Sequence, residues 1–153
     1  MRRLFLATVL AGICLPAMSQ AQPNQIYASP ADVAVAIARA KAAKALEAEV
    51  IVAASPFHVA VEYRSGPTPA SLHEKNNEII NVLEGSGTMI VGGRLKDERR
   101  RDDANLNGSG IDGGTSYALV KGSYMFIPAG TPHYFAAVGN DGLTITTTYV
   151  PKP

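Results

Sequence analysis

The stretch His73-Glu-Lys-Asn-Asn-Glu78-Ile-Ile-Asn-Val-Leu-Glu-Gly85 shows most directly what kind of fold this chain adopts. Side chains alternate between the two faces of a β-strand, so Glu78, Ile80 and Val82 lie together on one face. If Ile80 and Val82 face a core, the carboxylate of Glu78 enters the same apolar interior. There it must either lose its charge or find a cation. The stretch therefore predicts a strand that carries an acid into the core.

A second stretch, Gly122-Ser-Tyr-Met-Phe-Ile-Pro128-Ala-Gly130-Thr-Pro-His133, ends in a histidine. His133 shares a strand face with Phe135 and therefore also points inward. A single histidine or glutamate is more often structural than a ligand. Imidazole and carboxylate together are the ligands that a borderline divalent metal prefers. We therefore predict that His73, Glu78 and His133 bind one metal ion and leave coordination positions open.

Most of the remaining chain has the pattern of short strands separated by turn residues. One exception is an alanine-rich helix predicted from Val33 to about Glu47, with Ser29 as N-cap and Pro30 at the first helical position. Its apolar stripe is narrow, so it packs either on the outside of the strands or on a second subunit. About eight strands and one helix indicate an all-β sandwich or barrel with an N-terminal α-helix. The predicted strands cover residues 50–54, 57–63, 78–83, 88–91, 115–120, 124–127, 133–138 and 143–150.

Three segments between these strands are predicted to be irregular. Glu84-Gly-Ser-Gly87 has the composition of a hairpin turn, and Gly139-Asn-Asp-Gly142 that of another turn. Gly92 to Gly114 is rich in glycine and in charges of both signs, which predicts a long exposed loop. Such a loop is either solvated surface or a lid over a pocket.

The first 21 residues have the pattern of an export signal. Arg2 and Arg3 precede an apolar run from Leu4 to Leu15, and Ser19-Gln-Ala21 provides the small residues of a cleavage site. We expect cleavage near Ala21 and a periplasmic, secreted product. The organisation predicted is a signal peptide at 1–21, a leader and helix at 22–48, and a barrel domain at 49–153.

Removal of the signal peptide takes away the only cysteine, Cys14, so neither a disulfide nor thiol chemistry is expected in the mature chain. The mature chain keeps 12 basic and 13 acidic residues, a net charge of −1. This balance gives no reason to expect nucleic acid or an anionic membrane as a partner. No further apolar run is long enough for stable membrane insertion.

The two stretches resemble the paired motifs of the cupin superfamily. His73, Glu78 and Gly85 match the spacing of the first motif, and Gly122, Pro128, Gly130 and His133 match the second. The resemblance covers residues 59–150 and implies a double-stranded β-helix, or jelly-roll, barrel with a metal at its mouth. Ser71 stands where the family has its first histidine, so one of four usual ligands is replaced.

Three functions are compatible with these patterns. In an enzyme, the three residues would hold Fe, Zn, Mn or Ni for work on a small organic substrate, and the resemblance implies a dioxygenase, isomerase or lyase. Tyr124 and His58 are then the candidate catalytic acids or bases. In a non-catalytic binding module, the same barrel holds a metal or small ligand without turnover. In a structural protein, the alanine-rich helix forms a homodimer.

Overall fold

The computed structural model describes residues 24–43 and 48–153. The predicted signal peptide at 1–21 and the predicted end of the helix at 44–47 lie outside these residues. The described chain forms one helix and eleven strands, so the prediction of an all-β fold with an N-terminal helix is confirmed.

The helix α1 (Pro30–Ala43) begins as predicted. The backbone N–H of Asp32 donates to Oγ of Ser29 at 3.2 Å, and the N–H of Ser29 donates to Oδ2 of Asp32 at 2.9 Å. This reciprocal pair satisfies donors that a helix start leaves free. Ala36 and Ala40 are buried, and they pack with Ile51 and Val61 on the outer face of the strands.

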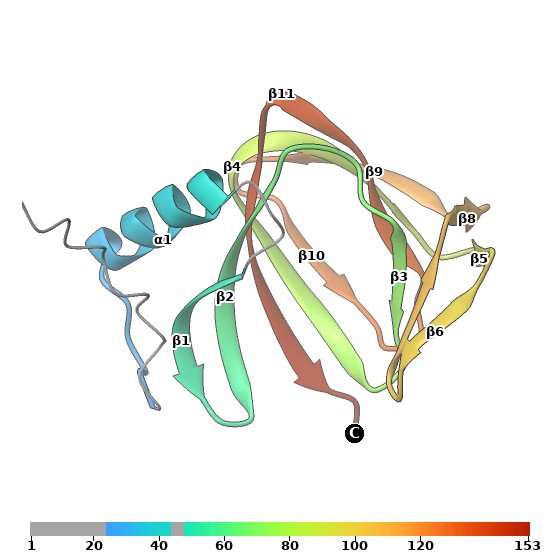
Figure 1. The fold of residues 1–153 in the computed structure, drawn as a ribbon, viewed down its shortest axis with the longest axis horizontal. Coiled ribbons are helices and arrows are strands. Elements are labelled where there is room, and N and C mark those ends of the chain that lie inside the picture. Colours follow the sequence, from blue (N-terminus) through green and yellow to red (C-terminus); the bar gives the residue numbers. More distant parts are fainter. Residues whose placement is uncertain (1–23, 44–47) are drawn as a thin grey trace, which may run out of the picture.

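The strands form two layers that face each other, joined by two long strands that run through both (Figure 1). These are β4 (Asn76–Val91) and β11 (His133–Pro151), which pair with each other along nearly their whole length. The first layer adds β1 (Glu49–Ala54), β2 (Phe57–Arg64) and β10 (Tyr124–Ile127). The second layer adds β3 (Ala70–His73), β6 (Arg99–Asp102), β7 (Asn105–Gly108) and β9 (Thr115–Val120).

The hairpin predicted at 84–87 is wrong, because β4 continues through this segment and bends there. Gly85 pairs with Leu143 and Gly87 with Val138, so β11 bends at the same place. Gly85 has a φ of +79°, and a Cβ there would lie 1.9 Å from the carbonyl oxygen of Gly142. Glycine thus allows the two strands to approach closely at the bend. The turn predicted at 139–142 is likewise an irregularity within β11 rather than a break between strands.

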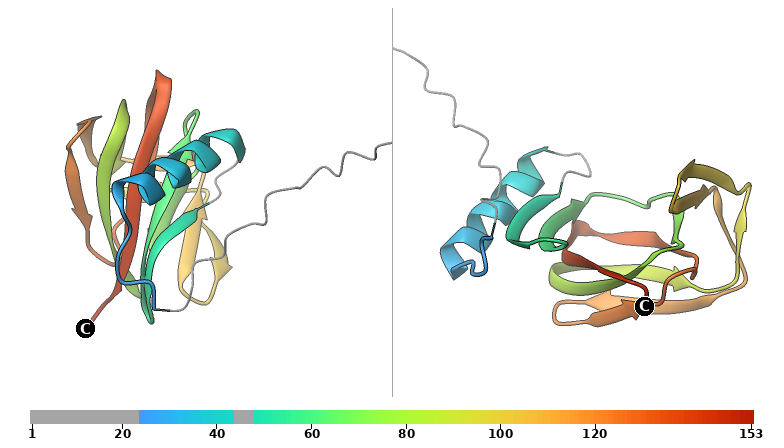
Figure 2. Two further views of the ribbon diagram at one scale, coloured as in Figure 1. Left: turned by 90° about the vertical axis from the view of Figure 1, so that its left-hand side faces the viewer. Right: turned by 90° about the horizontal axis from the view of Figure 1, so that it is seen from below.

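The long loop predicted at 92–114 is also wrong. It contains β6 and β7, which extend the second layer beyond β3, and the separate two-stranded sheet of β5 (Arg94–Lys96) and β8 (Gly110–Asp112). The sequence looked irregular because all four residues of β6 are exposed, while β7 has only Leu106 as an apolar residue. Leu106 packs with Leu95 and Ile111 in a small apolar cluster. Figure 2 shows this end of the molecule far from α1.

The main core lies between the layers, on the side formed by β4, β9 and β10. Its buried members are Ile80, Val82, Met89, Leu119, Ile127, Phe135, Leu143 and Ile145. Among the described residues, no helix has the length and apolar character needed to cross a membrane.

Candidate metal centre

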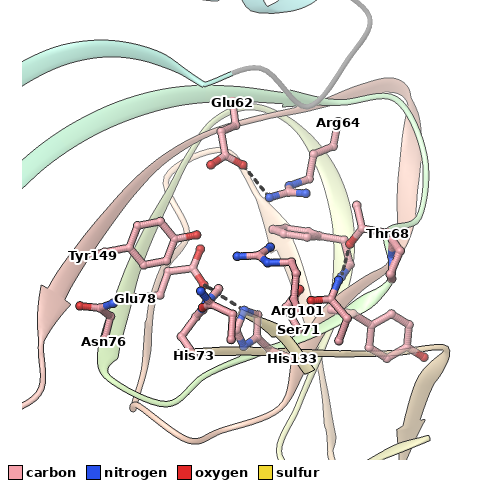
Figure 3. Close-up of a pocket in the computed structure, with 15 residues that line it drawn as sticks. Glu62, Arg64, Thr68, Ser71, His73, Asn76, Glu78, Arg101, His133 and Tyr149 are labelled. Atoms are coloured by element: carbon pink, nitrogen blue, oxygen red, sulfur yellow. Dashed lines mark hydrogen bonds and ion pairs between the residues drawn. The ribbon is translucent and has the colours of Figure 1, made fainter. Parts of the chain in front are cut away.

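A cavity of about 440 Å³ opens on the other side of the interior, between β2, β3 and β7 (Figure 3). Among the residues that line it are His73, Glu78 and His133. These three come from three strands, so the structure brings the predicted ligand set together.

Glu78 reaches this cavity because of the alternation predicted from the sequence. It lies on β4 with Ile80 and Val82, and all three side chains are buried, Glu78 to 3% exposure. Its neighbours across the sheet are Ile127 on β10 and Tyr149 on β11. An acid in this position needs a partner, because burial of an unpaired carboxylate is costly.

Both histidines approach Glu78 from the opposite layer. Nε2 of His133 lies 2.9 Å from Oε2 of Glu78, and Nε2 of His73 lies 3.7 Å from the same oxygen. One nitrogen or oxygen from each of the three residues lies within 4.8 Å of the others. The two imidazole rings are tilted against each other, with centroids 5.3 Å apart. The three side chains therefore converge on a single point.

The other ring nitrogen of each histidine is held by an oxygen. Nδ1 of His133 lies 3.0 Å from the carbonyl oxygen of Thr131, which can only accept, so Nδ1 carries the hydrogen. Nδ1 of His73 lies 2.5 Å from Oδ1 of Asn105. The amide nitrogen of Asn105 donates to both carboxylate oxygens of Asp102, at 2.7 and 2.9 Å, which fixes Oδ1 toward His73. In neutral rings, both Nε2 atoms thus present a lone pair toward Glu78.

This arrangement leaves Oε2 of Glu78 buried without a hydrogen bond from the described residues. A lone pair on nitrogen at 2.9 Å and a carboxylate oxygen repel each other unless a proton or a metal ion lies between them. Orientation of ligand histidines through Nδ1, by a carbonyl or carboxamide oxygen, is typical of metal sites. The donor set of two imidazoles and one carboxylate therefore fits a divalent ion.

Burial and the neighbouring positive groups have opposite effects on the pKa of Glu78. Burial raises the pKa of Glu78, but the contact with His133, the positive charges that His133 and His73 carry when protonated, and the charge of Arg64 outweigh it, so the net pKa is lowered. Burial also raises the pKa of Tyr149, and the charges of Glu78 and Glu62 add to this. Tyr149 is therefore a neutral hydroxyl at physiological pH, available as a hydrogen-bond donor in the cavity.

The two candidate catalytic residues lie outside the cavity. Tyr124 on β10 is 76% exposed, and its strand flanks β4 on the side of the apolar core. His58 on β2 lies behind Tyr149, with ring centroids 6.4 Å apart, while Tyr149 itself is 5.0 Å from His73. The positions of Tyr124 and His58 give no support to the catalytic roles predicted for them.

Several polar residues of the cavity were not predicted. Glu62 and Arg64 project into it from β2, and Arg101, Asn105 and Asn107 line it from β6 and β7. The alternation of β2 places Val59, Val61 and Tyr63 on one face and Glu62 and Arg64 on the other. That pattern indicates an apolar core face and a solvated polar face. In the structure, α1 packs on the apolar face of β2. The polar face points into the barrel and lines the cavity.

Ser71, at the position of the usual first histidine, also lines the cavity. It pairs with His133 on β11 and with Asn107 on β7. Oδ1 of Asn107 is buried without a hydrogen bond from the described residues. With Ser71 in place of a histidine, the cavity wall beside the three ligands is still polar.

No family model matches the sequence, and no curated protein matches it. Solved structures share its fold at low identity. The protein BH2720 of Bacillus halodurans is 19% identical, with a TM-score of 0.53 over 76% of this chain and 77% of that one. The cupin domain of Cnp3 from Schizosaccharomyces pombe is 14% identical, with a TM-score of 0.52 over 71% and 64%.

The hydroquinone 1,2-dioxygenase PnpCD, solved with Cd²⁺ and 4-hydroxybenzonitrile, is 16% identical, with a TM-score of 0.59 over 99% of this chain and 93% of that one. The predicted fold, a double-stranded β-helix barrel with an N-terminal helix, is therefore confirmed, and the Cnp3 cupin domain shares it.

Proposed function

We propose that this protein binds one divalent metal ion through His73, Glu78 and His133, and acts as an enzyme on a small organic substrate in the adjoining cavity. The observation that carries the proposal is the buried Oε2 of Glu78, which has no hydrogen bond from the described residues and faces Nε2 of His133 at 2.9 Å. A cation at this point satisfies the carboxylate and both nitrogens together.

The residues of the chain have separate tasks in this proposal. Asn105 and the Thr131 carbonyl hold the two imidazoles so that their Nε2 lone pairs converge. When bound, an ion with three protein ligands supplies Lewis-acid or redox chemistry at its open positions. Tyr149, whose pKa is raised by burial, keeps its proton and can donate a hydrogen bond to a substrate oxygen. The surrounding β-strands make the cavity rigid, which favours a fixed substrate orientation.

An enzyme is favoured over a passive binding module because the three residues that would hold the ion line a cavity of enzyme-like size. At about 440 Å³ it lies within the roughly 300–1,000 Å³ usual for small-molecule sites. PnpCD, with the same fold, is a dioxygenase. We propose a metal-dependent reaction of the dioxygenase, isomerase or lyase type, and the metal identity separates these.

Elemental analysis of the purified, untagged mature protein tests the proposal. We expect about one equivalent of metal per chain. Iron would favour oxygen chemistry, and zinc, manganese or nickel would favour lyase or isomerase chemistry. His133→Ala should abolish stoichiometric metal, while His58→Ala, a histidine outside the ligand set, should retain it. Wild-type protein that takes up less than about a tenth of an equivalent after metal repletion would contradict the proposal.

We also propose that the chain is exported and works in the periplasm, on the basis of the signal pattern at residues 1–21. Cell fractionation and N-terminal mass analysis check this, with a mature chain that begins at Gln22 as the expected result. A homodimer stays a prediction, which light scattering of the mature chain checks.

A further inference from the structure

Arg64 is an arginine held inside the barrel beside the candidate metal centre. Its side chain is 12% exposed, and it lines the same cavity as the three ligands. Its guanidinium carbon lies 4.2 Å from the centroid of the Phe135 ring, and one Nη donates to Oε2 of Glu62 at 2.6 Å. The stacking and the ion pair fix the plane of the guanidinium.

The hydrogen bonds of Arg64 are incomplete. Its Nε is buried and has no hydrogen-bond partner among the described residues. Glu62 is already engaged, because its other oxygen accepts from Oγ1 of Thr147 at 2.9 Å. A guanidinium carries five N–H donors, and a buried donor without an acceptor is destabilising. The second Nη group of Arg64 also makes no hydrogen bond with the described residues and, unlike Nε, is not fully buried. It is the donor that a ligand in the cavity can reach.

The charges that line the cavity favour an anion. Arg64 and Arg101 balance Glu62 and Glu78 when the histidines are neutral. A bound divalent ion raises this sum to +2. The side chain of Arg101 is 53% exposed, and Figure 3 shows it pointing from β6 into the cavity. Its Nε pairs with Oδ2 of Asp102 at 3.2 Å, which offsets part of the positive charge that it brings to the entrance.

We infer that the substrate or ligand is a small organic carboxylate, with its carboxylate against the second Nη of Arg64 and its reactive part toward the metal centre. This inference rests on the proposed function, since the metal supplies the second anchor. Arg presents a planar donor pattern that matches a carboxylate. A phosphate dianion fits less well, because Glu62 and Glu78 both line the same space.

The test is an NMR titration of zinc-loaded protein with three probes: butyrate, butyramide and inorganic phosphate. Butyramide has nearly the shape of butyrate but no charge. We expect butyrate to bind at least about tenfold more tightly than either of the others. Arg64→Lys keeps the charge that pairs with Glu62 but loses the planar guanidinium with its second Nη, so it should weaken butyrate binding by about tenfold or more.

Arg100→Lys is the matched control. Arg100 lies next to Arg101 on β6, but it is exposed and paired with Glu74 outside the cavity, so butyrate affinity should change by less than about twofold. Arg64→Gln, which removes the charge, should lose at least as much butyrate affinity as Arg64→Lys. Both Arg64 variants should retain the zinc content of the wild type, which shows that they are folded.

The two proposals fail separately in this experiment. Equal affinity for butyrate in wild type and Arg64→Lys, or tighter binding of phosphate or butyramide, overturns the carboxylate inference while the metal site stands. A wild type that holds no zinc overturns the proposed function. The effect of Arg64→Lys on butyrate binding by that metal-free protein then decides whether Arg64 is an anion anchor.

Discussion

The two sides of the barrel interior are built from the same kind of strand and filled in opposite ways. On one side, inward positions of β4 beyond Glu78, and those of β9 and β10, are apolar, and Ile80, Leu119 and Ile127 are each at most 2% exposed. On the other side, inward positions of β2, β3 and β7 are polar and enclose a cavity. Phe135 belongs to both, because it joins the apolar cluster and carries Arg64 on its ring.

The difference shows how this fold separates stability from chemistry. Inward positions on the apolar side can be filled tightly, since nothing has to enter. Inward positions on the polar side must leave space and hold charged groups in fixed places, which requires ion pairs and hydrogen bonds such as Glu62 with Arg64 and Thr147. Substitutions on one side should therefore change mainly stability, and on the other mainly ligand binding.

The largest expected effect is on the apolar side. Ile80→Ala removes a fully buried side chain, and we expect a loss of about 2–5 kcal/mol in the free energy of unfolding, measured by urea denaturation. Ile79→Ala is the control on the opposite face of the same strand, where the side chain is 37% exposed and the expected loss is below about 1 kcal/mol. Equal losses would contradict the assignment of the core side.

On the polar side, Glu78→Gln should affect metal binding more than folding. The amide has the same shape but no charge, and we expect the metal affinity to fall by more than about a hundredfold, beyond the usual effect of losing an outer partner. Competition with a chromophoric chelator measures this, and circular dichroism checks the fold. Unchanged affinity would remove Glu78 from the ligand set.

A smaller effect is expected at Asn105, which orients His73 without touching the metal position. Asn105→Ala should lower metal affinity by about 10–100-fold in the same competition assay. The control is Asn107→Ala, two residues along β7, which also lines the cavity but makes no hydrogen bond with either histidine. A similar loss in both variants would mean that β7 acts through the shape of the strand rather than through this hydrogen bond.

The smallest effect concerns alkaline pH. The pKa of Tyr149 is raised in the folded protein, so above about pH 10 the unfolded chain loses this proton first and unfolding becomes more favourable. Tyr149 should add about 1.4 kcal/mol per pH unit to the loss of stability in that range, and nothing below it. Denaturation at several pH values should show a shallower decline in Tyr149→Phe, with exposed Tyr124→Phe as control.

The sequence was most informative where a residue pattern and a chemical requirement agreed. Alternation placed Glu78 in the interior, and burial of an acid required a partner, so the convergence of His73 and His133 followed from two short stretches. The helix N-cap at Ser29 was also predictable from the sequence, because capping depends on a few neighbouring residues.

The errors arose where a local pattern had two structural outcomes. Glycines at 84–87 are compatible with a hairpin or with a bend in a continuous strand, and only pairing with β11 decides between them. The polar face of β2 is compatible with solvent or with a polar cavity. The choice depends on β3 and β7, and β7 is distant from β2 in the sequence. Cavity residues such as Arg64 and Tyr149 were missed for this reason.

The layer from which each ligand comes has a consequence for the open side of the barrel. Glu78 belongs to the first layer, whereas His73 and His133 belong to the second. An ion bound by all three would be a cross-link between the two layers beside the cavity. The cation proposed for catalysis would then also hold the two layers together at the open end of the barrel. Metal binding should therefore raise the melting temperature.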